Sequence, residues 1–201
     1  MKLIRHALAP VLALILALPA AAAEIPLAEL SRYLNSLTTA TADFTQVNAD
    51  GSISTGKIYI KRPGRVRFEY TSDDTLVIAG GSQVAIFDPK SNGGPEQYPL
   101  AKTPLTLILA ANVDLGQAKM VRAHRADGAK TVVTAQDPAH PEYGSIDLVF
   151  TAGPTELRQW VITDESGAKT TVILGDLTKG GALGSSLFSI PSEIARRKPA
   201  D

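Results

Sequence analysis

The chain has 201 residues, with 20 Lys and Arg against 20 Asp and Glu, 44% hydrophobic residues, 5% aromatic residues and no cysteine. Balanced charge argues against a strong electrostatic nucleic-acid binder. Without cysteine the chain has neither disulfide bonds nor a thiol nucleophile. The first predicted element is an export signal: Lys2 and Arg5 precede an uncharged apolar run over 7–18, and alanines at 20–23 supply an A-x-A cleavage site.

This N-terminal segment sets the expected domain organisation and location. An apolar run of 12 residues is too short to remain in a bilayer of about 30 Å as a spanning helix, so residues 1–23 are predicted to be a cleaved signal peptide. Cleavage after Ala23 leaves 178 residues with a net charge of −2, which is the size of one domain over 24–201. No cysteine follows the cleavage site to carry a lipid. We therefore expect a soluble protein of the periplasm.

The mature chain is predicted to begin with a helix. Pro26 suits the start of a helix, and the pattern ends between Thr38 and Ala42. Four leucines at spacings of three, four and three form one stripe along about three turns: Leu27, Leu30, Leu34 and Leu37.

Alternation with a period of two dominates the rest of the chain. Val66, Phe68 and Tyr70 alternate with charged residues, which is typical of a strand with one buried face. Gly80-Gly81 between two apolar runs predicts a hairpin. The regular spacing of short strands predicts one large antiparallel sheet, curled or closed. The further strands are predicted around Ile58 and Ile60 and over 76–79, 84–87, 119–124, 131–136, 145–151, 157–163 and 169–177.

One short segment interrupts the strand pattern. Thr103 is a candidate N-cap, Pro104 suits the first helical position, and Asn112 can end the helix. The residues between them are mostly apolar, so both sides of this helix must be covered by protein or by a ligand. Two interpretations stay open at this point: a plug that fills the mouth of a barrel, and a lid over a ligand.

Signals for catalysis are weak. Residues 51–58 resemble a phosphate-binding loop, but the final hydroxyl residue is missing and a strand follows, so a turn between strands is favoured. Asp137 and Glu142 lie near His140 as candidate metal ligands, but neither His140 nor His124 has a second histidine at ligand spacing. No G-x-S-x-G elbow occurs. We expect no enzyme activity, no metal and no cofactor.

An ordered set of short motifs carries a family resemblance. Each motif is weak alone, but in this order and spacing they resemble the LolA family of periplasmic outer-membrane lipoprotein carriers, over about Leu27 to Pro191. The motifs are Ala-Asp-Phe-Thr-Gln at 42–46, Gly-Lys-Ile-Tyr-Ile-Lys-Arg-Pro-Gly-Arg-Val-Arg-Phe at 56–68, Leu-Val-Ile at 76–78, Ile-Phe-Asp-Pro at 86–89 and Thr-Pro-Leu-Thr-Leu-Ile-Leu at 103–109.

The resemblance implies a mainly β fold with α-helices, namely an incomplete, curved antiparallel β-barrel covered by short lid helices. Between sheet and helices it implies an apolar cavity that takes the acyl chains of a lipoprotein. Arg62 matches a family arginine that hydrogen-bonds to the lid helices and holds the empty cavity shut, and Val66 and Phe68 match inward-facing hydrophobic positions. The chain departs from the family in being poorer in aromatic residues, which leaves cavity size and cargo affinity open.

The residues themselves suit these roles. A guanidinium carries five donors and stays charged, so Arg62 can satisfy several helix-end carbonyls together. The alternative is an exposed strand-end arginine beside Lys61 and Arg65. Apolar side chains of two predicted strand regions and of the helix after Pro104 are expected to line the cavity: Val66, Phe68, Tyr70, Ile78, Val84, Ile86, Leu105, Ile108 and Leu109.

The resemblance also implies partners. They are lipoproteins, an inner-membrane ABC transporter of the LolCDE type, and a LolB-type outer-membrane receptor or the outer membrane itself; we expect no nucleic acid and a monomer. Two other hypotheses stay open: a LolA-like module that binds another hydrophobic ligand or senses lipoproteins, and a periplasmic hydrolase. The basic tail over 194–201 is interpreted as a solvated terminus, with contact to anionic lipid or the transporter as the alternative.

Overall fold

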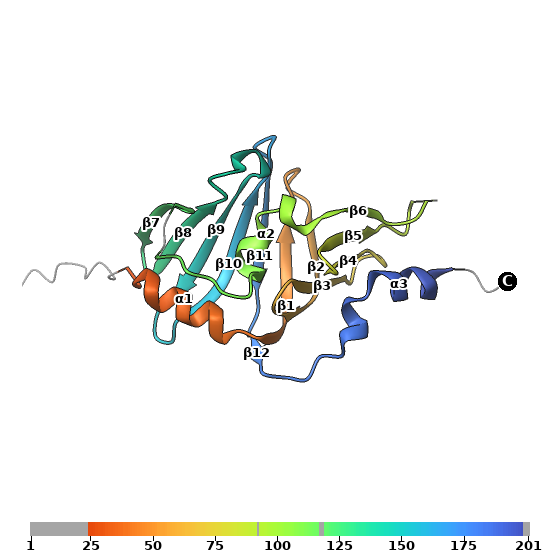
Figure 1. The fold of residues 1–201 in the computed structure, drawn as a ribbon, viewed down its shortest axis with the longest axis horizontal. Coiled ribbons are helices and arrows are strands. Elements are labelled where there is room, and N and C mark those ends of the chain that lie inside the picture. Colours follow the sequence, from red (N-terminus) through yellow and green to blue (C-terminus); the bar gives the residue numbers. More distant parts are fainter. Residues whose placement is uncertain (1–23, 92, 117–118, 199–201) are drawn as a thin grey trace, which may run out of the picture.

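The computed structural model describes residues 24–91, 93–116 and 119–198, so the predicted signal peptide over 1–23 lies outside the described residues. Within them, twelve strands form one antiparallel sheet accompanied by three α-helices (Figure 1). The strands are β1 Thr39–Val47, β2 Ile53–Lys61, β3 Arg65–Tyr70, β4 Leu76–Gly80, β5 Gln83–Phe87, β6 Glu96–Pro99, β7 Val121–Asp127, β8 Lys130–Gln136, β9 Ser145–Thr151, β10 Glu156–Thr163, β11 Lys169–Leu174 and β12 Thr178–Lys179. The helices are α1 Leu27–Ser36, α2 Leu105–Leu109 and α3 Ile190–Arg197, with 3-10 turns η1 Leu100–Lys102, η2 Pro141–Tyr143 and η3 Ser185–Phe188.

The sheet runs in the order β6-β5-β4-β3-β2-β1-β11-β10-β9-β8-β7, and β12 also pairs with β1. The long strand β1 is therefore central, paired with β2 along its whole length and with β11 near its C-terminal end. The two edge strands β6 and β7 do not pair with each other, so the barrel stays open. The predicted fold class, an incomplete, curved antiparallel barrel with short helices, is confirmed.

The sheet is strongly curled. Phe68 on β3 and Trp160 on β10 are four strand steps apart, which would separate them by about 19 Å in a flat sheet. Their ring centroids lie only 6.4 Å apart, at an interplanar angle of 81°. The two halves of the sheet therefore curve toward each other, and α2 lies over the gap between them in Figure 1.

Gly56 on β2 permits part of this curvature. It lies opposite Phe44 on β1 and Tyr70 on β3, and the Phe44 ring packs edge-on against the rings of Phe68 (5.4 Å) and Tyr70 (5.2 Å). A Cβ atom at Gly56 would overlap the backbone carbonyl of Glu69 and come within 2.7 Å of the Phe44 ring. A larger residue would force apart strands that the bend brings together.

We predict that Gly56→Ala lowers the free energy of unfolding by about 1–3 kcal/mol, because the added methyl group overpacks a close backbone contact. The measurement is urea unfolding followed by circular dichroism. Gly94→Ala is the control, since a Cβ atom there meets nothing within 4 Å. Equal stability of the two variants would contradict the assignment of the bend to Gly56.

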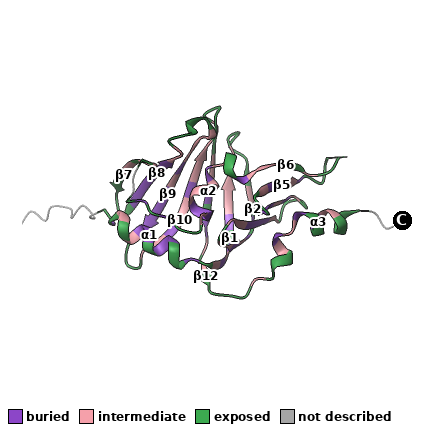
Figure 2. Cartoon of the chain, in the orientation of Figure 1, coloured by how far each residue is buried: buried purple, intermediate pink, exposed green. Residues whose placement is uncertain are grey.

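Two apolar clusters lie on opposite faces of the curled sheet. The larger fills the concave face between the sheet, α1 and α2, and the smaller lies on the convex face, where Ile190 of α3 packs against β4 and β5. Figure 2 shows buried residues on both halves of the sheet and on α1, whereas α3 is mostly exposed. The concave face is thus covered by α1 and α2, and the convex face only locally by α3.

The structure differs from three local predictions. The helix after Pro104 spans only Leu105–Leu109, Pro104 takes the N-cap position, and the Thr103 hydroxyl instead donates to the Leu100 carbonyl (2.8 Å). Leu105 and Leu107 are half-buried and pack against the concave apolar cluster, and no residue over 105–109 is exposed. Strand β6 forms over Glu96–Pro99, where no strand was predicted, and α3 takes in residues 194–197 of the predicted solvated tail. No described helix is long and apolar enough to cross a membrane.

Candidate functional site

The concave face carries most of the residues predicted to line a cavity. Val66 and Phe68 on β3 are 3% and 5% exposed, and both belong to the concave cluster. Tyr70 packs partly buried against the same cluster, and its hydroxyl donates to Gln46 Oε1 (2.8 Å). Burial raises the pKa of Tyr70 to about 12, so its hydroxyl stays neutral at physiological pH. Four more predicted residues share this cluster: Val84, Leu105, Ile108 and Leu109.

The structure corrects the prediction that Ile78 lines the cavity on the concave face. It is fully buried, but it belongs to the convex cluster under α3. The register places Val77 opposite Phe68 and Ala79 opposite Val66, so these two β4 residues face the concave interior instead. Ile86 lies opposite Val77, which puts it on the predicted concave face at half-buried exposure.

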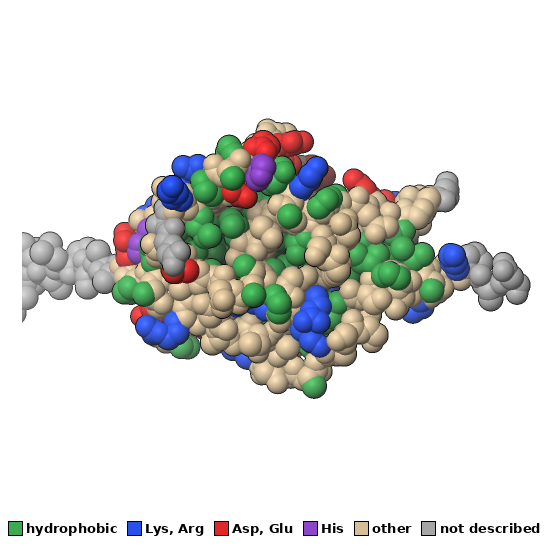
Figure 3. Space-filling model, viewed as in Figure 1, with side chains coloured by type: hydrophobic (Ala, Val, Ile, Leu, Met, Phe, Trp, Pro, Cys, Tyr) green, Lys and Arg blue, Asp and Glu red, His purple; other side chains and the backbone are tan. Residues whose placement is uncertain are grey.

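An apolar mouth opens beside α2. A cleft of about 690 Å³ lies between β4–β6 on one half of the sheet and the β10–β11 turn on the other. Apolar side chains line its walls and acidic ones its rim. Figure 3 shows hydrophobic side chains along the middle of this face and acidic ones at its upper edge. The lining residues are Val77, Val84, Glu96, Tyr98, Lys102, Thr103, Pro104, Leu105, Glu142, Tyr143, Ile162, Asp164 and Glu165.

Arg62 joins three parts of the molecule at the closed side of this interior. It follows the last residue of β2, and its backbone N–H donates to the Thr38 carbonyl (2.8 Å). Its Nη1 donates to the Leu34 carbonyl in the last turn of α1. Its Nη2 donates to the Ala110 carbonyl after α2 (2.5 Å) and to Asn35 Oδ1 (3.3 Å). One side chain therefore ties α1 and the end of α2 to the sheet.

The guanidinium is suited to this position. The last carbonyls of a helix lack partners within the helix and carry a partial negative charge, which a cation neutralises. Burial lowers the pKa of Arg62 from its ordinary value, but a guanidinium remains protonated in proteins. In the same turn, the Gly64 N–H donates to the Leu109 carbonyl (2.8 Å). The alternative of a merely exposed strand-end arginine does not fit these contacts.

Asn35 extends the connection between α1 and the segment after α2. Its Nδ2 donates to the Val113 carbonyl (2.8 Å), and its Oδ1 accepts from the Val113 N–H (2.9 Å). One turn earlier, Ser31 Oγ accepts from the Leu115 N–H (2.9 Å). Because these contacts join α1 directly to the segment after α2, both cover the interior as one connected unit. We call Arg62, Asn35 and their carbonyl partners the latch.

The sequence profile of the family described as "Outer membrane lipoprotein carrier protein LolA" matches residues 35–191. The chain belongs to the LolA family. Among its relatives, the outer-membrane lipoprotein carrier protein of Chromohalobacter salexigens is 25% identical over 169 residues, covering 80% of each chain. The outer-membrane lipoprotein carrier protein of Pseudomonas aeruginosa is 26% identical over 200 residues, covering 94% of each chain.

Among solved structures, a LolA-superfamily protein of Nitrosomonas europaea aligns with a TM-score of 0.43 and 9% identity, over 82% of this chain and 98% of that one. The LolA match includes Arg62, Asn35, α2 and the lining of the mouth, whereas Leu34, whose carbonyl accepts from Arg62, lies one residue before it. Most of α3 lies beyond it.

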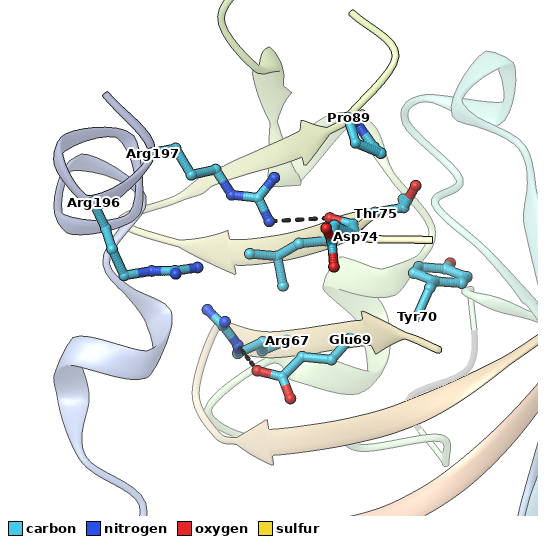
Figure 4. Close-up of a pocket in the computed structure, with 9 residues that line it drawn as sticks. Arg67, Glu69, Tyr70, Asp74, Thr75, Pro89, Arg196 and Arg197 are labelled. Atoms are coloured by element: carbon cyan, nitrogen blue, oxygen red, sulfur yellow. Dashed lines mark hydrogen bonds and ion pairs between the residues drawn. The ribbon is translucent and has the colours of Figure 1, made fainter. Parts of the chain in front are cut away.

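In this LolA-family chain, the convex face holds a polar cleft of about 610 Å³ between α3 and strands β3 and β4 (Figure 4). Arg67 lies in its wall, only 8% exposed, and pairs with Glu69 Oε1 (2.6 Å) and Glu193 Oε2 (3.6 Å). The buried Glu193 carboxylate also accepts hydrogen bonds from Arg196 (Nε, 3.2 Å) and Arg197 (Nε, 2.8 Å). The Arg67–Glu193 pair joins α3 to β3, and the two arginines of α3 hold the Glu193 carboxylate in place.

Glu193 should make this fastening sensitive to acid. Burial raises the pKa of Glu193, but hydrogen bonds from Arg196 and Arg197 and the charge of Arg67 outweigh it, so the pKa lies below its ordinary value. A lowered carboxyl pKa contributes stability above the unfolded pKa of about 4.3, and that contribution is lost as pH falls through the folded pKa.

We predict that Glu193→Gln lowers the free energy of unfolding by about 1–3 kcal/mol at pH 7, because it removes one of the two carboxylates that pair with the buried Arg67. The difference between wild type and variant should shrink below pH about 4. Urea unfolding at pH 7 and pH 3 measures both quantities, with the exposed Glu165→Gln as control. A difference that stays constant with pH would refute the role of the charge.

Neither histidine of the described chain belongs to a metal-binding group. Within 24–91, 93–116 and 119–198, no three or more His, Asp or Glu side chains lie where they could hold a metal ion together. His124 Nε2 lies 3.0 Å from the Ile25 carbonyl, which ties β7 to the segment before α1. His140 stacks on Tyr143 at 4.7 Å, with Nδ1 3.0 Å from Glu142 Oε1. As expected for 51–58, strand β2 begins at Ile53 after a turn at Gly51.

Proposed function

We propose that this protein is a periplasmic carrier that holds the acyl chains of lipoproteins released from the inner membrane and delivers them to the outer membrane. The observation that carries the proposal is the latch. Arg62 connects α1 and the end of α2 across an apolar concave face that opens at a mouth lined by Val84 and Leu105. A closable apolar interior is what a carrier of lipid chains requires.

Free-energy magnitudes support this role. Burial of one CH₂ contributes about 0.8 kcal/mol, so an acyl chain of about fifteen carbons gains on the order of 10 kcal/mol in an apolar site. Each hydrogen bond from Arg62 contributes about 1.5–3 kcal/mol at most. Entry of an acyl chain can therefore outweigh the latch, and re-formation of the latch favours release. The contacts of Arg62 are strong enough to bias the closed state and weak enough to open.

The remaining assignments follow from the carrier role and the LolA family membership. Residues 1–23 act as a signal peptide that is cleaved after Ala23, and residues 24–201 form a single carrier domain. The carrier works as a monomer without cofactor or catalysis. It receives lipoproteins from an inner-membrane ABC transporter of the LolCDE type and passes them to a LolB-type receptor or directly to the outer membrane.

A release assay tests the proposal. Inner-membrane vesicles carrying a labelled triacylated lipoprotein are incubated with ATP, with and without the purified protein, and the soluble fraction is analysed by native mass spectrometry. We expect a soluble complex of one carrier and one lipoprotein, followed by transfer to added outer membranes. Absence of a soluble complex would reject the carrier role, and a complex that never transfers would favour a lipoprotein-sensing module.

A further inference from the structure

The indole of Trp160 has a buried donor without an acceptor. Trp160 is 1% exposed, and among the described residues its Nε1 has no hydrogen-bond partner. Buried polar groups are nearly always paired, because an unsatisfied donor loses its hydration without compensation. A phenylalanine would fill a purely apolar position without this cost. The unpartnered N–H therefore calls for an acceptor that is absent from the closed protein.

The position of Trp160 indicates where such an acceptor enters. Trp160 lies on β10 in the concave cluster, opposite Leu148 of β9. Ile162, two residues farther along the same face of β10, lines the mouth beside α2. At a rise of about 3.3 Å per residue, Trp160 lies about 7 Å from Ile162 along the strand. Because Ile162 is half-buried and Trp160 is fully buried, Trp160 lies behind the mouth. There its ring contacts Phe68 from the other half of the sheet.

We propose that the Trp160 Nε1–H donates a hydrogen bond to an acyl carbonyl oxygen of the bound lipid. This inference rests on the proposed carrier function and names the ligand chemistry that its interior selects. In an acylated cargo the carbonyl groups sit at the head of each chain, and the hydrocarbon lies deeper. A donor one layer inside the mouth meets that level of the ligand, so Trp160 favours ester-linked or amide-linked chains over hydrocarbon of equal length.

Two other buried polar atoms without partners do not share this position. Arg62 Nε belongs to the latch. The Tyr33 hydroxyl lies under α1, with its ring 6.0 Å from Phe150. Phe150 is next to the β9–β10 turn, at the opposite end of β10 from the mouth. Of these three unpartnered atoms, only Trp160 Nε1 therefore lies where we expect the acyl carbonyl groups of a bound lipid.

Two short-chain probes test the inference: dioctanoylglycerol, with ester links, and the matched dioctylglycerol, with ether links. Their affinities are measured for wild type and Trp160→Phe by displacement of a hydrophobic fluorophore, and thermal unfolding checks that the variant folds. We expect Trp160→Phe to weaken binding of the ester roughly three- to tenfold and to leave binding of the ether unchanged. For each probe, the affinity of the variant is divided by that of wild type. Comparing these two ratios cancels the intrinsic difference in hydrophobicity between the probes.

The wild-type protein offers a second readout that needs no variant. Trp160 is the only tryptophan, so the indole N–H gives a single resonance in a ¹⁵N–¹H spectrum. We expect this resonance to move downfield with the ester and not with the ether. Suppose that wild type binds both probes, that Trp160→Phe weakens the ester no more than the ether, and that the ester does not move the resonance. The hydrogen bond from Trp160 is then rejected, while the proposed carrier function stands. If wild type binds neither probe, the proposed carrier function falls, and the inference with it.

Discussion

Arg62→Leu is expected to form the complex with lipoprotein but to lose its transfer to outer-membrane acceptors by at least tenfold. The substitution removes the hydrogen bonds to the Leu34 and Ala110 carbonyls, which costs the closed state roughly 2–5 kcal/mol. A shift of about 2.7 kcal/mol changes an equilibrium one-hundredfold. The open state with bound lipid then persists, because closure no longer favours release. The release assay with added outer membranes measures both steps.

Two matched variants distinguish the loss of the Arg62 hydrogen bonds from the loss of one positive charge. Arg65→Leu removes a neighbouring arginine that is not part of the latch, and it should transfer lipoprotein normally. Arg62→Lys keeps the charge but lacks the planar fork that reaches two carbonyls together, so its transfer should lie between wild type and Arg62→Leu. Normal transfer by Arg62→Leu would remove this residue from the mechanism, and an equal loss in Arg65→Leu would indicate a general effect of charge.

The parts of this fold that were predictable from sequence have one apolar and one polar face. Alternation in β3 identifies Val66, Phe68 and Tyr70 as one side of a strand, and the structure places all three toward the concave cluster. The leucine stripe after Pro26 likewise identifies α1. In these elements the residues on the opposite side are polar, so the sequence itself marks which side carries the apolar core.

Ile78 shows where this reasoning fails. The run over 76–79 is apolar on both faces, because β4 is covered by the concave cluster on one side and by α3 on the other. With no polar position in the run, periodicity cannot assign a face. Only the register with β3, which puts Val77 opposite Phe68, decides it.

The cover of the convex face was missed for the same kind of reason. α3 contains only two buried residues, Ile190 and Glu193, and one of them is a carboxylate. Its attachment depends on Arg67, a residue that reads as the polar side of an exposed strand. The sequence does not show that Glu193 and Arg67 are buried, because each is buried only when α3 packs against β3. The bonds from Asn35 to the Val113 backbone are hidden in the same way, since a backbone partner leaves no pattern in a sequence.

Phe68→Glu is expected to lower the affinity for a hydrophobic fluorophore more than tenfold. Phe68 lies between Phe44 and Trp160, so a carboxylate there brings a charge or an unsatisfied acid into the apolar space that the proposed carrier function assigns to acyl chains. Phe87→Glu is the matched control, since Phe87 is 4% exposed on the convex face and the Arg197 guanidinium lies 5.0 Å from its ring. It should bind the fluorophore like wild type.

Leu105→Glu keeps this prediction testable if Phe68→Glu does not fold. Leu105 is half-buried at the mouth, where a carboxylate can still reach water, so the fold should tolerate it while a charge appears in the path of the ligand. Fluorophore titration together with thermal unfolding distinguishes the two causes of lost binding. Because Phe68 and Phe87 are similarly buried on opposite faces of one sheet, the comparison assigns the ligand to a face. Equal loss of binding in both would mean that stability, not the concave face, controls the affinity.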